Sequence, residues 1–593
     1  MVVGIGGFLR RLPRFVHTAR QRHILITVTL VVLMLIFITS TFPPRTSLWT
    51  TTLSQSVTAP PPKTLPELQL LNLAQSPNTT TAASRFCEDR FGPSYLYNLQ
   101  DNAIQYCSQE PESHSRLTCF HTKRRNPIQT DSFCIAQGAS LDTSRSQYTL
   151  GDCTLRRPVR EELQRGLIPY TAIRGYWYDT GPRNVFSQFF TTFETASRPL
   201  LALRAFLPFT NTQTVFTILV KREGEGNLWH CLMEIWSLTE SLDVLRLTTD
   251  PQTAQPFFHA PTDVPNAQVV ILDEHPDGPY FDLWTMLAGR PPVRLKEALK
   301  SGRFKQGTML AASPGTKHKV IVPLAGAANP IWENDWVDRA CEDAALLKLF
   351  GRRVLNHVGV RAFDAPTEEA SSTLSLVQVQ ARQPRKIRVT YIVRKESRRV
   401  LYFDALLSSA RLAFPDVEAR LVDFASLPFA EQVRIVHQET DVLVGVHGAG
   451  LTHTMFLHGD WVERGGGKAV VEIQPDIMDY KGFHNMARML GHGYFMAKAH
   501  SMSRDDLEEE RVSLSAKERR GGARQEENDE TFGGPEDLDF SAQREAHTHE
   551  DGHLHKRLDW HFVDVKINET WFLEVIGEAV AYVKGWRESE GLN

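Results

Sequence analysis

DFASLPFAEQVRIVHQETDVLVGVHGAGLTHTMFL, residues 423–457, is the clearest stretch of pattern in this chain of 593 residues. Its apolar residues recur at helical spacing over 429–438. A short apolar run over 441–446 is typical of a buried strand, and small residues then open a second helix over 451–457. Because a strand lies between helical segments, the stretch predicts a βαβ unit of a parallel sheet.

The same alternation continues on both sides of this stretch. Downstream and just upstream, the patterns predict strands at 387–393, 419–424, 469–474 and 561–567, and helices at 400–412 and 571–586. The first half predicts strands at 214–220, 267–272 and 317–324, and helices at 228–238 and 338–350, the latter ending at Gly351. The predicted fold class is therefore α/β, with two facing Rossmann-like domains.

The N-terminus predicts a membrane anchor. Residues 24–42 form an uncharged apolar run of 19 residues, preceded by five arginines and no acidic residue. This length spans a bilayer as a helix, and the positive-inside rule places residues 1–23 in the cytoplasm and the remainder in the lumen. A cleaved signal peptide is the alternative interpretation. The layout is that of a type II membrane protein.

Composition excludes several classes of protein. The chain is 42% hydrophobic and 23% charged, with a formal net charge of −3. These values argue against a wholly disordered chain, a collagen, a multi-span membrane protein and a nucleic-acid binder. Residues 504–551 hold 16 acidic and 7 basic side chains, a net charge of −9 (7 − 16), so the rest carries +6 (−3 + 9). We expect this acidic insertion to be disordered.

All seven cysteines follow the apolar run, and five of them fall within residues 87–153. In an oxidising lumen this predicts a disulfide-stapled segment with at least one cysteine left over, in pairings that the sequence leaves open. Glycosylation sequons begin at Asn78 and Asn568. The expected order is a cytoplasmic tail (1–23), an anchor (24–42), a stalk (43–85), a cysteine-containing segment (86–158), an N-terminal domain (159–350) and a C-terminal domain (351–593).

The strand at 441–446 leads into His447-Gly448-Ala449-Gly450. Small residues at the carboxyl end of a parallel strand let an anion approach the backbone, and the following helix offers free N–H groups. A diphosphate would fit, although a tight turn without a ligand is the alternative. The glycines do not complete the GxGxxG pattern of dinucleotide-binding loops. HGAG also resembles the oxyanion loop of esterases, but the chain lacks the GxSxG nucleophile motif that such enzymes require.

Basic residues follow the neighbouring strand pattern at 387–393. Arg394, Arg398 and Arg399 lie just past its carboxyl end. Adjacent parallel strands would bring these guanidinium groups near the HGAG loop, where their forked donors match phosphate oxygens. A solvated basic loop is the alternative.

Two further groups of polar residues are candidates for chemistry. Asn227, His230 and Glu234 share one face of the helix at 228–238, in apolar surroundings where Glu234 or His230 could act as a general base. Their alternative is a polar stripe facing solvent. Four histidines in HTHEDGHLH, residues 547–555, have the composition of a zinc site but lie in the acidic insertion.

These elements together resemble glycosyltransferase family 61. The resemblance lies in residues 423–457, in VTYIVRKESRR (389–399), in NLWHCLMEIWS (227–237) and in AVVEIQP (469–475). It implies a GT-B fold of two Rossmann-like domains, a UDP-sugar donor and transfer with inversion. Neither the acidic insertion nor the cysteine-containing segment has a counterpart in it.

The resemblance also implies roles for individual residues. Arg394 and the loop of Gly448, Ala449 and Gly450 would hold the diphosphate, with Arg398 and His447 assisting. Glu472 would contact the nucleoside. Glu234 or His230 would be the base, and Asn227 would lie on the acceptor side.

The expected function is therefore transfer of GlcNAc or xylose from a UDP-sugar to a Ser/Thr hydroxyl or a glycan. We expect no cofactor, with divalent-metal dependence left open, and no nucleic-acid partner. The expected location is the Golgi or endoplasmic reticulum membrane, with the catalytic body in the lumen. An inactive membrane-anchored binding or scaffold protein of the same fold is the alternative.

Overall fold

The computed structural model describes residues 82–107, 115–123, 130–150, 153–191, 214–224, 226–301, 317–342, 344–360, 386–395, 398–457, 467–502 and 563–589. The expected tail, membrane helix, stalk, acidic insertion and histidine cluster lie outside these ranges, apart from the last residues of the stalk. Among the described helices, none combines the length and the apolar character that crossing a bilayer requires.

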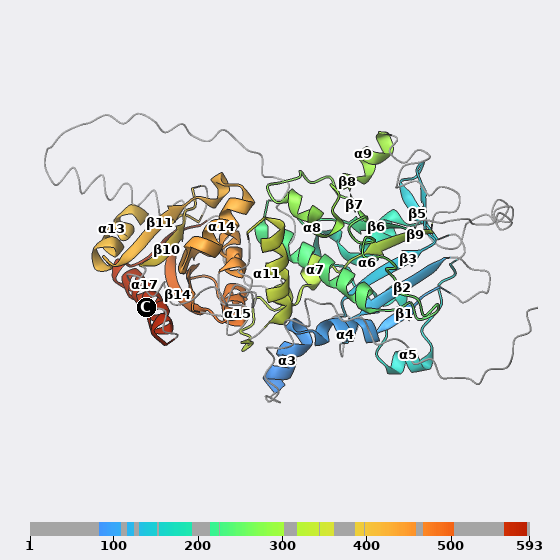
Figure 1. Ribbon diagram of the computed structural model, residues 1–593, viewed down its shortest axis with the longest axis horizontal. Helices are drawn as coiled ribbons and strands as arrows, with labels where there is room; N and C mark the ends of the chain where they lie inside the picture. Colours follow the sequence, from blue (N-terminus) through green and yellow to red (C-terminus); the bar gives the residue numbers. More distant parts are fainter. Residues whose placement is uncertain are drawn as a thin grey trace, which may run out of the picture. The chain divides into compact units, whose positions relative to one another are not determined.

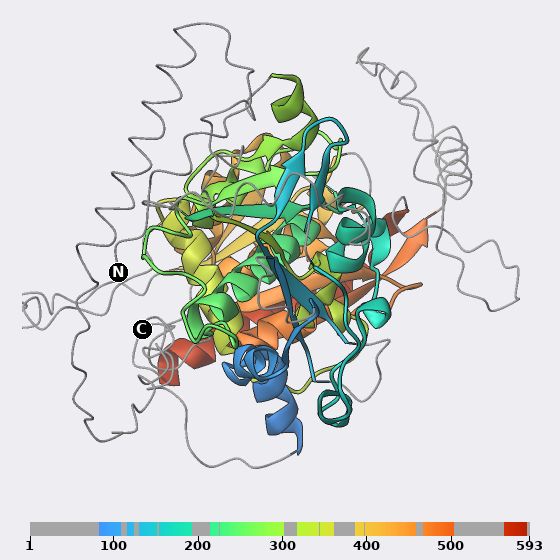
Figure 2. The same ribbon diagram turned by 90° about the vertical axis from the view of Figure 1, so that its right-hand side faces the viewer.

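The first half of the chain builds a seven-stranded mixed sheet (Figures 1 and 2). Its order is β1 (Ala103–Gln105), β2 (Arg116–His121), β3 (Ser132–Gln137), β9 (Lys317–Val322), β6 (Thr214–Val220), β7 (Gln268–Ile271) and β8 (Val293–Arg294). The pairings from β1 to β9 are antiparallel, whereas β9, β6, β7 and β8 run parallel. The first half has the expected α/β class, but only four of the seven strands of its sheet have the parallel pairing of a Rossmann-like domain.

The cysteine-containing segment is part of this sheet, not a separate unit. Strands β2 and β3 are almost fully buried, so they need cover on both faces, which a short independent segment could not supply. Three disulfides join the cysteines in the pairs Cys87–Cys341, Cys107–Cys153 and Cys119–Cys134. Disulfides are confirmed, but only Cys107–Cys153 and Cys119–Cys134 lie within the expected segment, since Cys87 pairs with the distant Cys341. The cysteine outside these disulfides is Cys231, which is buried.

A long helix, α7 (Leu228–Leu247), packs in the core of the first half. It begins where the pattern predicted but runs nine residues further than 238, because nearly all its side chains are buried. A helix that is apolar all round belongs in a core rather than at a surface. Asn227 caps its start, since its side-chain oxygen accepts a hydrogen bond from the N–H of Trp229 at 2.9 Å.

Helix α11 (Ala345–His357) corrects the helix expected at 338–350. It starts later than predicted, four residues beyond Cys341, which forms a disulfide with Cys87. It then continues through Gly351 for almost two turns. A glycine inside a helix costs about 1 kcal/mol relative to alanine. The buried side chains of Phe350 and Val354 offset that cost by packing into the core.

The second half builds a six-stranded sheet in the order β11 (Val417–Val422), β10 (Ile387–Ile392), β12 (Val442–Val446), β13 (Ala469–Pro475), β14 (Gly493–Met502) and β15 (Asp564–Lys566). All pairs are parallel except β14 with β15. The chain leaves β10 toward β11 and then returns across β10 to β12. The order of strands therefore reverses between β10 and β12, and ligands bind parallel sheets at such a point, beyond the carboxyl ends.

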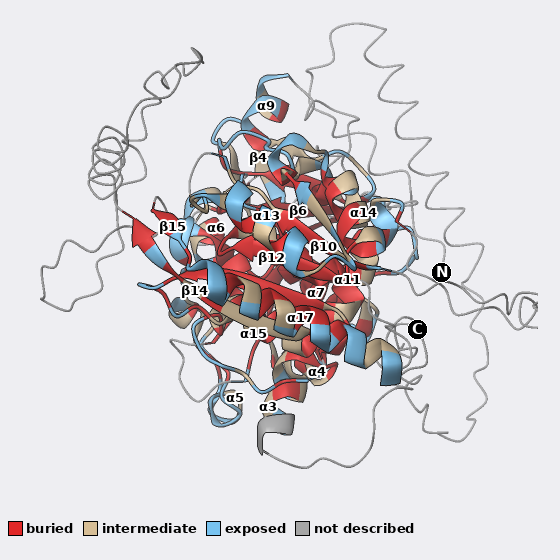
Figure 3. Ribbon diagram, turned by 90° about the vertical axis from the view of Figure 1, so that its left-hand side faces the viewer, coloured by how far each residue is buried: buried red, intermediate tan, exposed pale blue. Residues whose placement is uncertain are grey.

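Helices cover this sheet on its two faces: α13 (Phe403–Ala413), α14 (Phe429–Glu439), α15 (Gly482–Met489) and α17 (Glu569–Ser589). Figure 3 shows buried strands beneath α17, whose outer face is exposed. Its buried residues, from Phe572 to Val583, recur at three and four positions and form one apolar stripe. The helix expected at 451–457 is instead the 3₁₀ helix η9 (Ala449–Phe456).

The remaining elements are short. They are α3 (Ala82–Phe91), α4 (Ser94–Asp101), α5 (Arg160–Gln164), α6 (Gly181–Phe189), α8 (Thr285–Ala288), α9 (Leu295–Lys300), α10 (Pro330–Glu333), β4 (Ser140–Asp142), β5 (Gln147–Thr149), η3 (Tyr170–Ala172), η4 (Trp177–Asp179), η6 (Phe281–Trp284), η7 (Gly326–Ala328) and η8 (Phe424–Ser426).

Candidate active site

Two arginines lie against the glycine loop at the reversal point of the second sheet. Arg394 and Arg398 follow β10, and Gly448 follows β12. A Cβ atom on Gly448 would lie 2.7 Å from Nη1 of Arg394 and 2.8 Å from Nη1 of Arg398. The expected proximity to the HGAG loop is therefore confirmed for Arg394 and Arg398, and a glycine is required at position 448 for it. The prediction was wrong for Arg399, whose guanidinium group is paired with Asp564, with Nη2 and Oδ2 2.6 Å apart.

The backbone around these arginines adopts unusual conformations. Gly448 has a φ of 146°, and Arg398 has a φ of 56°, which is uncommon for a residue with a side chain. Arg398 Nη1 donates a hydrogen bond to the carbonyl oxygen of His447 at 3.0 Å. Strained backbone of this kind is found at ligand sites, where the surrounding structure holds it in place.

His447 is held from behind by a buried carboxylate. Its Nδ1 lies 2.7 Å from Oε1 of Glu472, and the hydroxyl of Tyr494 donates to Oε2 at 2.5 Å. Glu472 is fully buried, and both its oxygens have partners inside the protein. The carboxylate of Glu472 is thus engaged with His447 and Tyr494, and its expected contact with a nucleoside stays a prediction.

The loop after Gly448 is equally constrained. A Cβ on Gly450 would lie 3.2 Å from Ile392, so this glycine faces apolar neighbours, not the arginines. The carbonyl oxygen of Gly450 accepts a hydrogen bond from Nδ1 of His453 at 2.8 Å. Burial lowers the pKa of His453 to about 4, so its ring is neutral at physiological pH and carries its hydrogen on Nδ1. Ala449 opens η9 between the two glycines.

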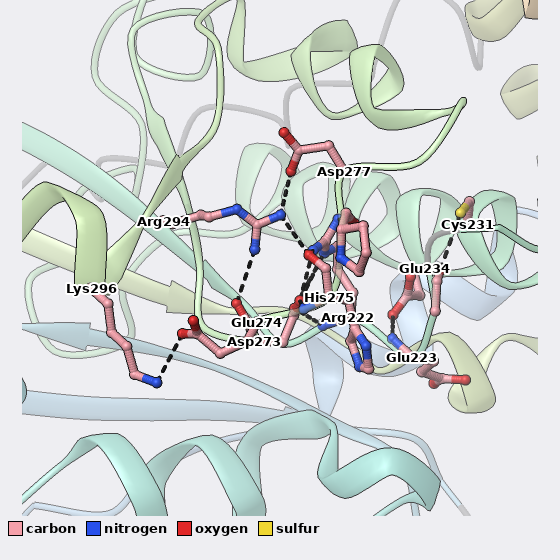
Figure 4. A network of polar contacts seen from close by, with 12 residues as sticks. Arg222, Glu223, Cys231, Glu234, Asp273, Glu274, His275, Asp277, Arg294 and Lys296 are labelled. Carbon is pink, nitrogen blue, oxygen red and sulfur yellow. Dashed lines mark hydrogen bonds and ion pairs between the residues drawn. The ribbon is translucent and has the colours of Figure 1, made fainter. Parts of the chain in front are cut away.

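A second group of residues lies at the carboxyl end of β6, in the first sheet. Glu223 follows this strand by three residues, and its Oε1 accepts hydrogen bonds from the N–H of Ala327 at 3.1 Å and the hydroxyl of Thr180 at 3.4 Å. The N–H of Glu223 donates to Oε1 of Glu234 at 2.6 Å (Figure 4). Two buried carboxyl groups thus lie side by side.

Gly326 makes this packing possible. A Cβ at this position would lie 2.7 Å from Cγ of Glu234 and 3.1 Å from Oε1 of Glu223. The loop after β9 therefore closes directly over both carboxyl groups. A small hollow opens beside Glu234, lined by Thr180, Lys221, Leu324, Gly326 and other residues of these loops.

Burial keeps this pair partly protonated. It raises the pKa of Glu223 to about 7. Burial, followed by the nearby charge of Glu223, raises the pKa of Glu234 well above its usual range. Because neighbouring buried carboxylates cannot both ionise at low cost, the pair retains a proton at neutral pH.

His230 stands in front of the pair. Its Nδ1 lies 3.9 Å from Oε2 of Glu223, and its ring packs edge-on against Trp332 and Tyr178, at 4.5 and 5.9 Å between ring centroids. The side chain of His230 is 19% exposed, whereas that of Glu223 is fully covered. The capping residue Asn227, one turn before His230, is exposed.

An ion pair fixes the loop that carries Glu223. The guanidinium group of Arg222 pairs with Asp273, beyond β7, with Nη2 and Oδ1 2.7 Å apart (Figure 4). The backbone N–H of Arg222 donates a hydrogen bond to Oδ2 of the same aspartate at 2.7 Å. Both side chains are buried. This pair ties the ends of β6 and β7 together, so the backbone at Glu223 has little freedom to move.

Aromatic packing connects the two groups of residues. Trp229, at the start of α7, contacts Tyr480 and Phe483 at centroid distances of 6.2 and 5.4 Å. The same two rings contact His447, at 4.7 and 5.5 Å. The helix that carries His230 and Glu234 therefore begins beside the loop that carries His447.

Comparisons with known proteins match the part of the chain that carries the arginines and the glycine loop. A model of the family described as Glycosyltransferase 61 matches residues 344–462, which include Arg394, Arg398 and the HGAG loop. This stretch of the chain resembles the glycosyltransferase 61 family. The match begins after Glu223, His230 and Glu234 and ends before Glu472, so it covers the arginine and glycine side of the site alone.

Three proteins named EGF domain-specific O-linked N-acetylglucosamine transferase are similar to the chain. The protein from Drosophila melanogaster is 27% identical over 244 residues, 41% of this chain and 39% of its own length. Those from Xenopus laevis and Mus musculus are 32% and 31% identical over 157 residues, 26% of this chain and 25% of their own lengths. The chain thus aligns with a quarter to two fifths of these relatives.

Sequence reasoning missed Glu223. The available signal was an acidic residue three positions beyond the strand pattern Thr214–Val220, at the edge where parallel sheets bind ligands. Nothing local indicated that Glu223 would lie beside Glu234, because the residues that bury both of them come from the loop after β9.

Replacing Glu223 with glutamine should change how stability depends on pH. Since the pKa of Glu223 is raised in the folded protein, the native state binds this proton more tightly than the unfolded chain, and stability falls as pH rises from about 4.5 to 7. The glutamine of Glu223→Gln cannot ionise. The free energy of unfolding of this variant, relative to that of the native chain, should therefore rise by about 1–3 kcal/mol between pH 5 and pH 8.

Urea unfolding at pH 5 and pH 8 measures this gain. The exposed Glu274, on the loop after β7, provides a matched control, because Glu274→Gln should be equally stable relative to the native chain at both values. An equal effect of Glu223→Gln at both pH values would show that this carboxyl group ionises normally.

Proposed function

We propose that the chain is an inverting glycosyltransferase that moves GlcNAc, or alternatively xylose, from a UDP-sugar to a Ser/Thr hydroxyl or a glycan. The observation that carries the proposal is the placement of Arg394 and Arg398 against Gly448 at the reversal point of a parallel sheet. The names of the curated relatives favour UDP-GlcNAc as the donor.

The arginine pair suits a departing nucleoside diphosphate. When the bond to the sugar breaks, negative charge accumulates on the diphosphate, and two guanidinium groups already in place stabilise it without reorganising. Arginine donates two hydrogen bonds in a planar fork that matches phosphate oxygens. His447, held by Glu472, would then complete the donor site beside the loop.

The acceptor would enter from the side of the first sheet. Two exposed aromatic side chains contact residues of the site there: Tyr178, 51% exposed, packs against His230, and Trp336, 56% exposed, packs against Tyr480. Aromatic rings offer flat apolar faces for an acceptor. A donor on one sheet and an acceptor on the other is the GT-B arrangement, which we propose for this chain.

Inversion requires a base on the acceptor side. The acceptor oxygen attacks the anomeric carbon from the face opposite the diphosphate and loses its proton as the new bond forms. His230 and Glu234 on α7 are the candidates. The first turn of their helix contains Trp229, which packs against Tyr480 and Phe483, and Tyr480 in turn contacts His447 of the HGAG loop.

The compartment and the metal requirement are part of the proposal. Three disulfides favour an oxidising lumen, and the apolar run at 24–42 would anchor the chain in the Golgi or endoplasmic reticulum membrane. We propose that transfer needs no divalent metal, because arginines would neutralise the diphosphate. Activity that survives EDTA treatment would support this point, and its loss would refute it.

Donor binding provides the test of the proposed function. UDP-GlcNAc, UDP-xylose, UDP-galactose and GDP-mannose should be compared for protection of the lumenal body against thermal unfolding. A bound donor stabilises by RT ln(1 + [L]/Kd), about 2.7 kcal/mol at a hundredfold excess over Kd. We expect protection by UDP-GlcNAc or UDP-xylose, and its loss in Arg394→Ala.

A matched control is Arg411→Ala, which removes an exposed arginine from α13 and should leave the protection intact. No protection by any UDP-sugar would contradict the transferase. Protection without sugar transfer to any acceptor would instead favour the inactive binding protein.

A further inference from the structure

The three candidate proton acceptors differ in their access to an acceptor hydroxyl. The side chain of His230 is 19% exposed, that of Glu223 is fully covered, and Glu234 is buried beneath Gly326. Of these three, His230 alone can meet an incoming oxygen without the loops around it opening. The two carboxyl groups therefore stand behind the histidine, in the order Glu223 and then Glu234.

Glu223 is fixed with one oxygen directed at the ring. Its Oε1 is held by Ala327 and Thr180, while its Oε2 lies 3.9 Å from Nδ1 of His230. This Oε2 is buried and has no hydrogen-bond partner among the described residues. A buried oxygen left in this state is costly, so its retention suggests a use in the reaction.

The ring of His230 has little room to turn away. Trp332 from α10 and Tyr178 from η4 pack edge-on against it. Tyr178 and Asp179 have φ values of 57° and 55°, a left-handed conformation that residues with side chains rarely adopt twice in succession. This strained turn brings Tyr178 onto the histidine.

From this geometry we infer that Glu223 is a positioning residue for His230, which is the base of the reaction. The inference rests on the proposed function. The acceptor hydroxyl passes its proton to Nε2 of His230 as the bond from oxygen to the anomeric carbon forms. The bond from that carbon to the diphosphate oxygen breaks, and its electron pair leaves with the nucleoside diphosphate. The proton later passes from His230 to solvent.

Glu223 acts in this step through charge and orientation. Its carboxylate faces Nδ1, so it favours the tautomer in which Nδ1 carries the hydrogen and Nε2 is free to accept the proton. When the ring becomes an imidazolium, the carboxylate compensates its charge inside a covered site, where such compensation is strongest.

Glu234 has a supporting role. Its Oε1 accepts the N–H of Glu223 at 2.6 Å and so holds the backbone of the positioning residue. A glutamine at this position keeps that acceptor, since its side-chain oxygen can take the same place. Glu234→Gln should therefore cost less turnover than the loss of a base would, which separates the two roles.

The charged and titratable groups that face His230 come from separate elements. Glu223 approaches from the loop after β6, and the Tyr178 hydroxyl belongs to η4. Trp332 from α10 carries no charge, and Glu234, one turn along α7, lies behind Glu223. Among the described residues whose contacts with the ring are given above, Glu223 is therefore the one that carries a charge toward it.

Three variants of the full chain test the inference, with sugar transfer measured from pH 5 to pH 9 and donor protection measured by thermal unfolding. His230→Ala should lower turnover by about 10²–10⁴-fold, the usual contribution of a general base. Glu223→Gln should lower it by about 10–10²-fold and move the acidic limb of kcat/KM to lower pH, because the imidazolium loses its compensating charge. Glu234→Gln should lower turnover by less than Glu223→Gln does, because glutamine still offers an oxygen to the N–H of Glu223.

Donor protection should be unchanged in all three variants, which shows that each still folds and binds. If Glu223→Gln does not fold, Glu223→Asp replaces it and should keep the acidic limb near its native position. The inference is overturned if His230→Ala retains most of its turnover, if Glu223→Gln leaves both turnover and the acidic limb unchanged, or if Glu234→Gln loses more turnover than His230→Ala. Absence of donor protection in the native chain would refute the proposed function instead, which is a separate result.

Discussion

Gly448→Ala should abolish detectable donor protection and lower sugar transfer by at least about 10²-fold, the loss expected when one preorganised donor to a developing charge is removed. The added Cβ would lie within 2.8 Å of Nη1 of both Arg394 and Arg398, so both guanidinium groups must move. The φ of 146° adds strain that alanine cannot relieve. One methyl group would thus displace two cations from the site.

The same loop offers a matched control for this variant. Gly450→Ala places its methyl group 3.2 Å from Ile392, an apolar neighbour, in a backbone conformation without a positive φ. It should cost some stability but retain donor protection by the UDP-sugar that protects the native chain. Equal loss of protection in both variants would mean that the loop as a whole, not the arginine contact, is what alanine disturbs.

Asp441→Asn should destabilise the second half by about 3–5 kcal/mol, the usual cost of removing one partner from a buried ion pair. Asp441 is fully buried and faces three cations. Its Oδ1 lies 2.5 Å from Nζ of Lys468, and its Oδ2 lies 3.3 Å from Nε of Arg388 and 2.9 Å from Nη2 of Arg587. Without the carboxylate these cations would repel one another.

The position of Asp441 explains why the effect should be large. It joins the start of β10, through Arg388, to the segment before β13, through Lys468, and to the end of α17, through Arg587. Urea unfolding measures the loss of stability. Glu418→Gln, an exposed carboxylate on β11, should change stability by less than about 0.5 kcal/mol. A comparably small effect of Asp441→Asn would show that the cluster contributes little.

Much of the second sheet could be predicted from the sequence. Strands β10, β12 and β13 lie within a residue of their predicted bounds, because short apolar runs between helical patterns leave few alternatives. The closeness of Arg394 and Gly448 followed from the same argument, since the carboxyl ends of adjacent parallel strands share one edge.

Other features depended on contacts that no local pattern reveals. Gly351 has the local character of a helix end, yet α11 continues through it because its buried face packs into the core. Strands β1–β3 form antiparallel pairs and join β9, which is almost 180 residues further along the chain, so the mixed sheet could not be anticipated from alternating helices and strands.

By itself, the sequence determined the family resemblance, the α/β character of each half and the arginine and glycine side of the site. These rest on short-range periodicity and on residues that directly follow strands. Only the tertiary structure decided which cysteines pair, that Glu472 lies behind His447, and that Glu223, Glu234 and His230 form one group. The physical reason is burial: the covering loop at Gly326 and the rings of Trp332 and Tyr178 come from distant parts of the chain, and their packing sets the access and protonation of each group.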